Sequence, residues 1–137
     1  MTPIEQLLAE QEIQRLVIAY ALANDDGDWD ALAATLTEDC RYTRPSGGEA
    51  VAGRDAIRAS YAARPPRLSR HVISNIFVTF ESDESATCRS TMLLYVGGEE
   101  GKAQAPALLG GSRDRLVKTP AGWRFSERIG FLDLRIA

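Results

Sequence analysis

The sequence predicts an α+β fold in which helices come first and an antiparallel sheet follows. Apolar residues recur at helical spacing through the first 68 residues. After residue 68 the period changes to two, as in β-strands. No repeat, linker or low-complexity tract interrupts the chain, so we expect one domain, residues 1–137, with helices packed on one face of a curved sheet.

The first predicted helix covers residues 2–24. Thr2 can cap its N-terminus, Pro3 suits the first helical position, and Glu5 can complete a capping box. Gly27, in the turn NDDGD, can adopt the positive φ that breaks a helix. This helix therefore has both a start and a stop signal.

Two shorter helices are predicted next. Residues 29–39 follow Asp28, which can act as their N-cap. Their inward face would consist of Trp29, Leu32 and Leu36. Residues 53–64 form a third amphipathic segment, which two prolines end. The stretch between these helices is expected to begin with a short extended piece and to continue as a loop.

The second half of the chain predicts a meander of strands. The strand segments are 69–80, 85–97, 105–118 and 122–134. Short polar connections such as ESDE and TPAG separate them, except for a longer Gly-rich stretch before the third. Such connections are typical of antiparallel neighbours.

Composition argues against several classes of partner and location. The formal net charge of −3 gives no attraction for nucleic acid or for an anionic membrane surface. No stretch approaches the roughly 18 apolar residues of a membrane span, and no signal peptide is visible, so we expect a cytoplasmic protein. In a reducing cytoplasm Cys40 and Cys88 should be free thiols, although the sequence alone leaves a disulfide open.

His71, the only histidine, is the third residue of the strand 69–80. Strict alternation places His71, Asn75 and Phe77 on one face of this strand. His71 is then either a core or rim side chain with an ordinary hydrogen-bond partner, or an acid or base in a pocket. The second interpretation requires a carboxylate that fixes the tautomer of the ring.

The aspartates of YALANDDGDWD are the candidates for that carboxylate. Asp28 and Asp30 suit the cap and first turn of the second helix, and Asp26 is expected in solvent. Asp25 follows Tyr20 by five residues, about 140° around an ideal helix. Either the helix ends or bends near Asp25 so that both reach one pocket, or Asp25 is a loop residue.

Four stretches of the chain, in this order, resemble SnoaL-like proteins of the nuclear-transport-factor-2-like (NTF2-like) superfamily. They are QRLVIAYALANDDGDWDALAATLTEDC, VAGRDAIRASYAA, SRHVISNIFV and GGSRDRLVKTPAGWRFSER. The resemblance covers nearly the whole chain. It implies a cone of bent antiparallel sheet with three helices across its open side, enclosing an apolar pocket. It also implies self-association, as a dimer or a trimer.

The resemblance also implies site residues. In scytalone dehydratase, bile-acid 7α-dehydratase and lindane dehydrochlorinase, a histidine on the first long strand pairs with an aspartate at the end of the first helix. His71 and Asp25 match these two, and Tyr20 matches a tyrosine of the first helix. The chain departs from the pattern in lacking a second pocket histidine and in having Ser112 where many relatives carry tyrosine.

We therefore expect a cofactor-free lyase, with dehydration as its leading reaction, or an isomerase that acts on a small, mostly apolar cyclic compound. His71 would remove a proton from carbon, Asp25 would hold its tautomer, and Tyr20 would polarise a carbonyl or assist the leaving hydroxide. Proposed substrate contacts are Tyr42, Asn75, Trp29, Phe77, Met92, Tyr95, Arg115 and Phe131. The sequence does not show which of Arg113, Asp114 and Arg115 faces the pocket.

Functions that depend on a metal or a nucleotide have less support in the sequence, whereas a non-catalytic function stays open. One histidine and scattered carboxylates make a poor metal site, and no nucleotide-binding motif occurs, so we expect neither metal nor cofactor. The small subunits of ring-hydroxylating dioxygenases share the fold and do no chemistry. The chain is therefore alternatively a non-catalytic binding or assembly module. A separation of His71 from Asp25 beyond about 5 Å would favour that alternative.

Overall fold

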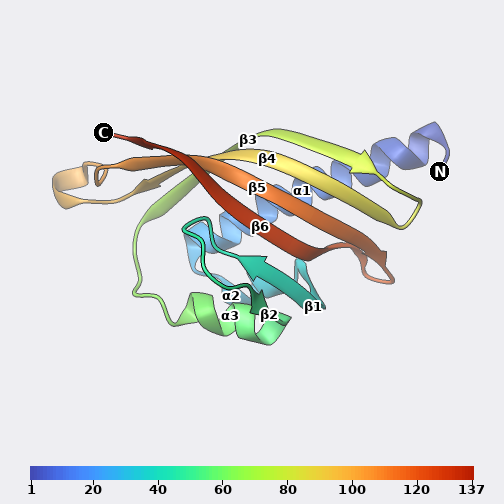
Figure 1. Cartoon of the computed structure of the whole chain (residues 1–137), viewed down its shortest axis with the longest axis horizontal. Helices are drawn as coiled ribbons and strands as arrows, with labels where there is room; N and C mark the ends of the chain where they lie inside the picture. The colour runs from blue at the N-terminus through green and yellow to red at the C-terminus, as the bar shows by residue number, and fades with distance from the viewer.

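The computed structural model describes all 137 residues, Met1–Ala137. Its elements are α1 (Pro3–Asp26), α2 (Trp29–Ala33), β1 (Leu36–Thr43), β2 (Val51–Ala52), α3 (Arg54–Ala62), β3 (Ser69–Phe80), β4 (Ser85–Val96), the 3-10 turn η1 (Glu99–Gly101), β5 (Ala107–Thr119) and β6 (Gly122–Ile136). Figure 1 shows β3–β6 as a curved layer with α1 behind it and α2 and α3 below. The predicted α+β class is confirmed.

Six strands form one sheet in the order β2-β1-β6-β5-β4-β3. The predicted meander is confirmed, because β3, β4, β5 and β6 are antiparallel neighbours. However, β1 pairs with β6 in parallel, so the sheet is mixed rather than antiparallel throughout. A parallel pair needs a long connection, and here the chain between the two strands includes α3 and the other three strands of the meander.

The second helix is shorter than predicted. It ends at Ala33, and Leu36 begins β1 instead of continuing the apolar face of the helix. Leu36 pairs with Phe125, and the amide of Phe125 donates a hydrogen bond to the carbonyl of Thr35 at 2.9 Å. Thr35 and Thr37 are β-branched and suit a strand better than a helix interior, so pairing and local preference act together.

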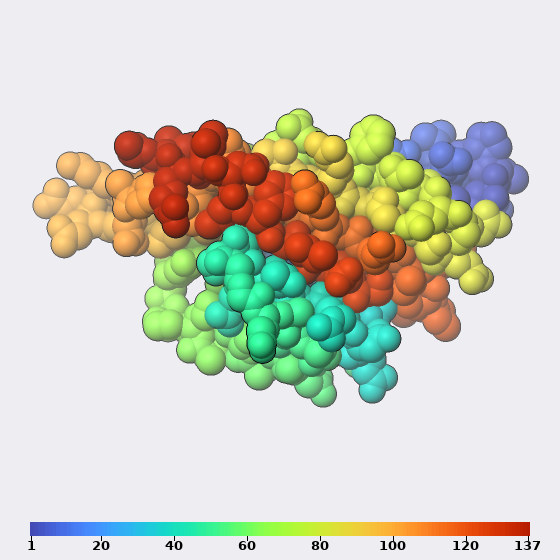
Figure 2. All heavy atoms as spheres, in the orientation of Figure 1, coloured from blue at the N-terminus to red at the C-terminus, as the bar shows by residue number.

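Helix α1 begins and ends as predicted. The Thr2 hydroxyl accepts from the Glu5 amide at 3.2 Å, and the Glu5 carboxylate accepts from the Thr2 amide at 2.8 Å. Gly27, with φ of 69°, closes the other end in the left-handed conformation. No helix in the structure is both long enough and apolar enough to cross a bilayer. Figure 2 shows the start of α1, in blue, and the β4–β5 connection, in light orange, projecting at opposite ends.

The hydrophobic core lies between α1, α2, α3 and the inner face of the sheet. Its largest fully buried side chains are Trp123, Phe125, Ile13, Leu32, Ile57, Leu116, Val17 and Cys40. Each such apolar side chain contributes roughly 1.5–3 kcal/mol through burial. Cys40 and Cys88 are buried free thiols, as predicted. Burial raises the pKa of each to about 12, so neither is a nucleophile at neutral pH.

Strand β3 contains a bulge that exchanges its two faces. Its pairing with β4 shifts between Ser74 and Phe77, and Asn75 has φ of 52°. An extra residue at this point reverses the alternation of side chains. His71 points inward before the bulge and Ile76 packs on the core after it, whereas Asn75 and Phe77 are exposed. The prediction that His71, Asn75 and Phe77 share one face is wrong.

Candidate active site

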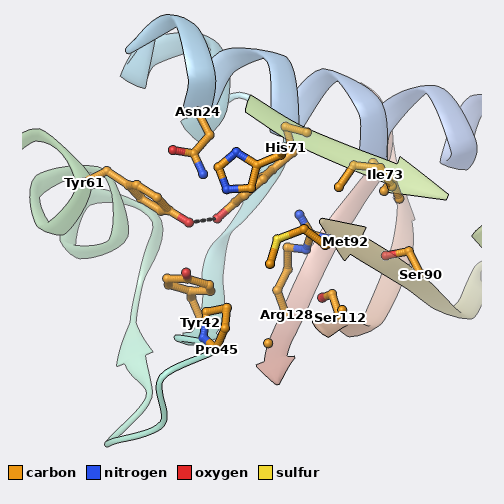
Figure 3. A pocket seen from close by; sticks show the side chains of 15 residues that line it. Asn24, Tyr42, Pro45, Tyr61, His71, Ile73, Ser90, Met92, Ser112 and Arg128 are labelled. Atoms are coloured by element: carbon orange, nitrogen blue, oxygen red, sulfur yellow. Dashed lines mark hydrogen bonds between the residues drawn. The ribbon is translucent and has the colours of Figure 1, made fainter. Parts of the chain in front are cut away.

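A cavity lies between α1, α3 and the inner face of the sheet. It contains about 530 Å³ of empty space, a figure that includes the open solvent at its mouth. Figure 3 shows side chains that meet there from α1, α3 and the strands β1, β3, β4, β5 and β6. The lining consists of Val17, Tyr20, Ala21, Asn24, Tyr42, Pro45, Tyr61, His71, Ile73, Ser90, Met92, Gly111, Ser112, Arg128 and Gly130.

His71 and Asp25 form a hydrogen-bonded pair at one wall of this cavity. The distance between His71 Nδ1 and Asp25 Oδ1 is 2.5 Å. Asp25 also accepts hydrogen bonds from the His71 amide at 2.9 Å and from the Ser69 hydroxyl at 2.9 Å. These donors hold the carboxylate in one orientation, which makes Nδ1 the donating nitrogen of the ring. Nε2 has no partner in the protein and is free to act on a ligand.

The pKa shifts of the pair favour an uncharged imidazole beside a carboxylate. Burial lowers the pKa of His71, Asp25 opposes this, and the charges of Arg67 and Arg64 lower it further. Burial alone would raise the pKa of Asp25, but the hydrogen bonds and charge of His71 outweigh it and lower that pKa. At neutral pH the pair can therefore accept a proton at Nε2.

Helix α1 positions Tyr20 and Asp25 without a bend. The helix continues to Asp26, and Tyr20 and Asn24, four residues apart, both line the cavity. Asp25 lies one residue further around the helix and does not line the cavity. It hydrogen-bonds to His71 Nδ1, so of the two predicted site residues of α1 only Tyr20 lines the cavity itself.

A group of tyrosines forms a second polar feature of the cavity. The hydroxyls of Tyr20 and Tyr61 are 2.7 Å apart, as the dashed line in Figure 3 marks. The ring of Tyr61 stacks on Tyr42 with ring centroids 5.5 Å apart. Burial raises the pKa of both Tyr20 and Tyr61. Both hydroxyls therefore stay protonated, and because one donates to the other, the pair has one O–H left to donate to a ligand oxygen.

A buried ion pair on β5 and β6 forms another wall. Asp114 accepts hydrogen bonds from Arg128 Nε at 2.9 Å and Nη2 at 3.0 Å, and a further one from the Ser112 hydroxyl. The Arg128 guanidinium lies 4.3 Å from the centroid of the Tyr20 ring. Burial alone would lower the pKa of Arg128, but Asp114 outweighs it and raises that pKa. Arg128 therefore brings a permanent positive charge to the cavity lining.

The cavity offers hydrogen-bonding and proton-accepting groups rather than a set of metal ligands. No three His, Cys, Asp or Glu side chains lie close enough together to hold a metal ion. His71 already shares Nδ1 with Asp25, and the remaining polar groups are hydroxyls, an amide and a guanidinium. This arrangement can move a proton and stabilise a developing negative charge with its own side chains.

Comparison with known proteins identifies the family of this chain. A model of the SnoaL-like domain matches residues 5–129. The chain belongs to the SnoaL-like domain family. The predicted resemblance is therefore confirmed. A search of curated proteins finds no match for this SnoaL-like domain.

Three solved structures from Novosphingobium aromaticivorans resemble this SnoaL-like domain. One, provisionally named a scytalone dehydratase, is 26% identical with a TM-score of 0.85, covering 98% of this chain and 90% of that one. An NTF2-like protein with a cystatin-like fold is 25% identical with a TM-score of 0.80, covering 94% and 84%. A third, provisionally named an aromatic ring hydroxylase, is 26% identical with a TM-score of 0.77, covering 98% and 93%. The predicted cone-shaped fold is confirmed.

Only part of the predicted substrate-binding set lines the cavity of this SnoaL-like domain. Tyr42 and Met92 do so. Trp29 stacks on the ring of Tyr61, 5.5 Å away, outside the lining. Asn75 and Phe77 are exposed because of the bulge in β3.

The remaining predicted contacts face outward because of strand alternation. Tyr95 follows the inward Leu94 on β4 and is 40% exposed. Phe131 follows Gly130, which lines the cavity, and its ring lies 5.1 Å from the Arg113 guanidinium. Arg115 is exposed and lies 3.7 Å from Glu127 on the surface. In the run 113–115 the inward residue is therefore Asp114, and both arginines face out.

Sequence reasoning misses two site residues that the structure brings into the cavity. Tyr61 is recognisable from the sequence only as part of the apolar face of the third helix. Arg128 lies in the run SERIG, where nothing local separates it from the surface arginines of the other strands. What distinguishes Arg128 from them is the register of β5 with β6, which pairs it with Asp114. That register becomes visible only in the folded sheet.

Proposed function

We propose that this SnoaL-like domain is a cofactor-free lyase that eliminates water from a small, mostly apolar cyclic ketone. The observation that carries the proposal is the hydrogen-bonded Asp25–His71 pair, whose imidazole lines the cavity. The similarity to a protein provisionally named a scytalone dehydratase also supports elimination. Isomerisation, which begins with the same proton transfer, is the other reaction that this base would serve.

In the proposed reaction, Nε2 of His71 removes a proton from the carbon next to the substrate carbonyl. The electrons of the broken C–H bond form an enolate. As the carbonyl re-forms, the carbon–carbon double bond forms and hydroxide leaves from the neighbouring carbon. The imidazolium, stabilised by Asp25, returns its proton to the departing hydroxide, so water is released and His71 is neutral again. A positioned base of this kind contributes about 10²–10⁴ to the rate.

The other polar groups of the cavity would stabilise the oxygen that gains charge. The hydrogen-bonded pair of Tyr20 and Tyr61 can donate its remaining O–H to the enolate oxygen, with Tyr42 beside it. Arg128 would add a fixed positive charge, already oriented by Asp114. Donors that are in place before the reaction lower the barrier because they need no reorganisation when the charge develops.

Bicyclic β-hydroxy ketones are the probes that test this proposal. Elimination is followed by the absorbance of the conjugated product, and proton abstraction by exchange of the α-proton with deuterium, observed by NMR. We expect His71→Asn to lose about 10²–10⁴ in rate. Thr79→Ala, an exposed position on the same strand, serves as the control and should keep the wild-type rate. Exchange without elimination would favour isomerisation.

A non-catalytic binding or assembly module is the second candidate function. The resemblance to the small subunits of ring-hydroxylating dioxygenases favours it, and one similar solved structure is provisionally named an aromatic ring hydroxylase. This candidate predicts that the wild type neither eliminates water nor exchanges the α-proton of any probe, and that a large oxygenase subunit co-purifies with it. Those two results together would replace the lyase proposal.

We also propose that the chain self-associates through the outer face of its sheet. Cross-strand neighbours on that face form an apolar row of Val72, Leu93, Leu109 and Leu134. Val72 is 50% and Leu134 is 60% exposed, and a continuous apolar surface of this kind is typical of an interaction site. Light scattering gives the mass in solution, where a dimer or a trimer is expected and a monomer would contradict the proposal.

A further inference from the structure

The opening of the cavity is lined by arginines that form no ion pairs. Arg44, Arg64 and Arg67 line an extension of the cavity, which also includes His71 and Tyr42 from the lining described above. No aspartate or glutamate lines this extension, although the chain as a whole has a net charge of −3. None of the three arginines takes part in an ion pair.

Arg64 is held in place by contacts that orient its charge without cancelling it. Its Nη2 donates a hydrogen bond to Asn24 Oδ1 at 2.9 Å. Its guanidinium lies 4.5 Å from the ring centroid of Tyr61 and 5.9 Å from that of Trp29. An amide oxygen and two aromatic faces fix a guanidinium while leaving other N–H groups available for a ligand.

The arginine charges act on one another and on the imidazole. Burial, followed by the charge of Arg64, lowers the pKa of Arg67, and the charge of Asp25 opposes this shift without reversing it. The charges of Arg67 and Arg64 also lower the pKa of His71. Like charges held this close repel one another, and a bound anion would relieve that repulsion. The opening is therefore electrostatically complementary to a negative group.

The sheet side of the same extension is apolar. Its lining there consists of Met92, Leu94, Leu108 and Leu132, from β4, β5 and β6. The arginines lie in the segments that follow β1 and α3. A ligand that fits both sides has an apolar body against the strands and a negative group against these two segments.

We propose that the substrate of this domain is a cyclic compound that carries a carboxylate, which Arg64 and Arg67 bind at the opening with the help of Arg44. The ring of this compound would then extend inward along the leucines to His71. Guanidinium groups bind carboxylates through paired, charge-assisted hydrogen bonds. The claim that the ring reacts at His71 rests on the proposed function, whereas binding of the carboxylate by the arginines does not require the reaction.

The experiment compares two ligands of the same shape, 2-naphthoate and 2-naphthamide, which differ in charge at neutral pH. Binding is followed by NMR through the imidazole signals of His71, the only histidine of the chain. We expect the acid to bind about tenfold to hundredfold more tightly than the amide. Arg64→Gln and Arg67→Gln should each lose most of this preference, and Arg64→Lys should keep part of it.

Arg70→Gln is the matched control. It removes the same charge from an exposed position one residue from His71 that does not line the cavity or its extension. Equal affinity for acid and amide, no binding of the acid, or an equal loss in Arg70→Gln would overturn the proposal. A preference for the acid without turnover of any ketone would instead keep the anion site and overturn the proposed reaction.

Discussion

Two aspartates outside the cavity lining each hold a nitrogen-containing side chain that belongs to the lining. Asp25 holds His71, which lines both the inner cavity and its opening, whereas Asp114 holds Arg128, which lines the inner part alone. An imidazole can lose its proton at neutral pH and a guanidinium cannot. One pair can therefore exchange a proton with a ligand, while the other supplies a fixed charge. The same carboxylate chemistry serves two purposes because the partner differs.

The two pairs also differ in what holds them. Asp25 accepts its hydrogen bonds from His71 and Ser69, within one stretch of β3. Asp114 and Arg128 come from neighbouring strands, and the Asp114 side chain is completely buried. Removing Asp114 leaves a charge inside the protein, whereas removing the Asp25 carboxylate leaves an imidazole that can stay neutral. The first change should therefore act on stability and the second on chemistry.

Asp114→Ala should have the largest effect on the fold. It leaves the buried guanidinium of Arg128 without a counter-charge, which costs about 3–5 kcal/mol in the free energy of unfolding. Urea denaturation measures this loss. Asp30→Ala is the control, because Asp30 pairs with Arg58 at 2.8 Å on the surface, with its side chain 85% exposed. That control should lose about 1 kcal/mol or less, and equal losses would contradict the comparison.

Asp25→Asn should lower the rate of the proposed reaction by about 10²-fold or more, since the carboxylate that stabilises the imidazolium is lost. Asp25 raises the pKa of His71 against burial and the nearby arginines, so that pKa should fall further in the variant. The base acts when neutral, so kcat/KM rises with pH through this pKa, and the rising limb should move to lower pH. NMR titration of the single imidazole and a pH–rate profile measure both effects.

An unchanged pKa of His71 in Asp25→Asn would show that the pair seen in the structure does not govern the titration of the ring. Asp26→Asn is the matched control for this experiment. Asp26 is the neighbouring aspartate of α1 and is exposed, so its charge should have little influence on His71. Equal shifts in the two variants would assign the effect to overall charge rather than to the hydrogen bond.

Tyr61→Phe tests the group that lies between the two pairs. The Tyr20 hydroxyl bonds to Tyr61, and the Tyr20 ring lies 4.3 Å from the Arg128 guanidinium. Without the Tyr61 hydroxyl, the buried hydroxyl of Tyr20 loses its partner, which costs about 1–2 kcal/mol in unfolding free energy. Tyr95→Phe removes the same atom from an exposed ring and should change little. Equal effects would argue against a linked polar cluster.

The pairs differ as well in how far the sequence predicts them. The capping signals at Thr2 and Gly27 are local, so the ends of α1 follow from the sequence directly. The choice of Asp25 as the partner of His71 depends on the family resemblance, because helical spacing alone leaves it open. Arg128 is missed because its inward position depends on the register of two long strands, which the local pattern does not contain.

The bulge in β3 marks the point at which sequence reasoning fails. Strict alternation gives the correct face for His71 and the wrong one for Asn75 and Phe77. The reason is that β3 has one additional residue between Ser74 and Phe77 in its pairing with β4. The shift in pairing and the positive φ of Asn75 reveal it in the structure. An asparagine tolerates this conformation better than most residues do, yet a single asparagine within an apolar strand is too weak a signal to predict a bulge.

Phe77→Ala tests this exchange of faces and should have the smallest effect. If Phe77 lay on the face of His71, its removal would open the core or the cavity at a cost of about 3–5 kcal/mol. Because Phe77 is 66% exposed, we expect a change within about 0.5 kcal/mol in a monomer. Phe80→Ala is the matched comparison, since Phe80 packs on the core against Trp123 with ring centroids 5.7 Å apart and should lose several times more. Urea denaturation of both variants at low protein concentration measures this difference. Self-association would bury Phe77 against a partner chain and would make the measured stability depend on protein concentration, so the low concentration separates the two effects.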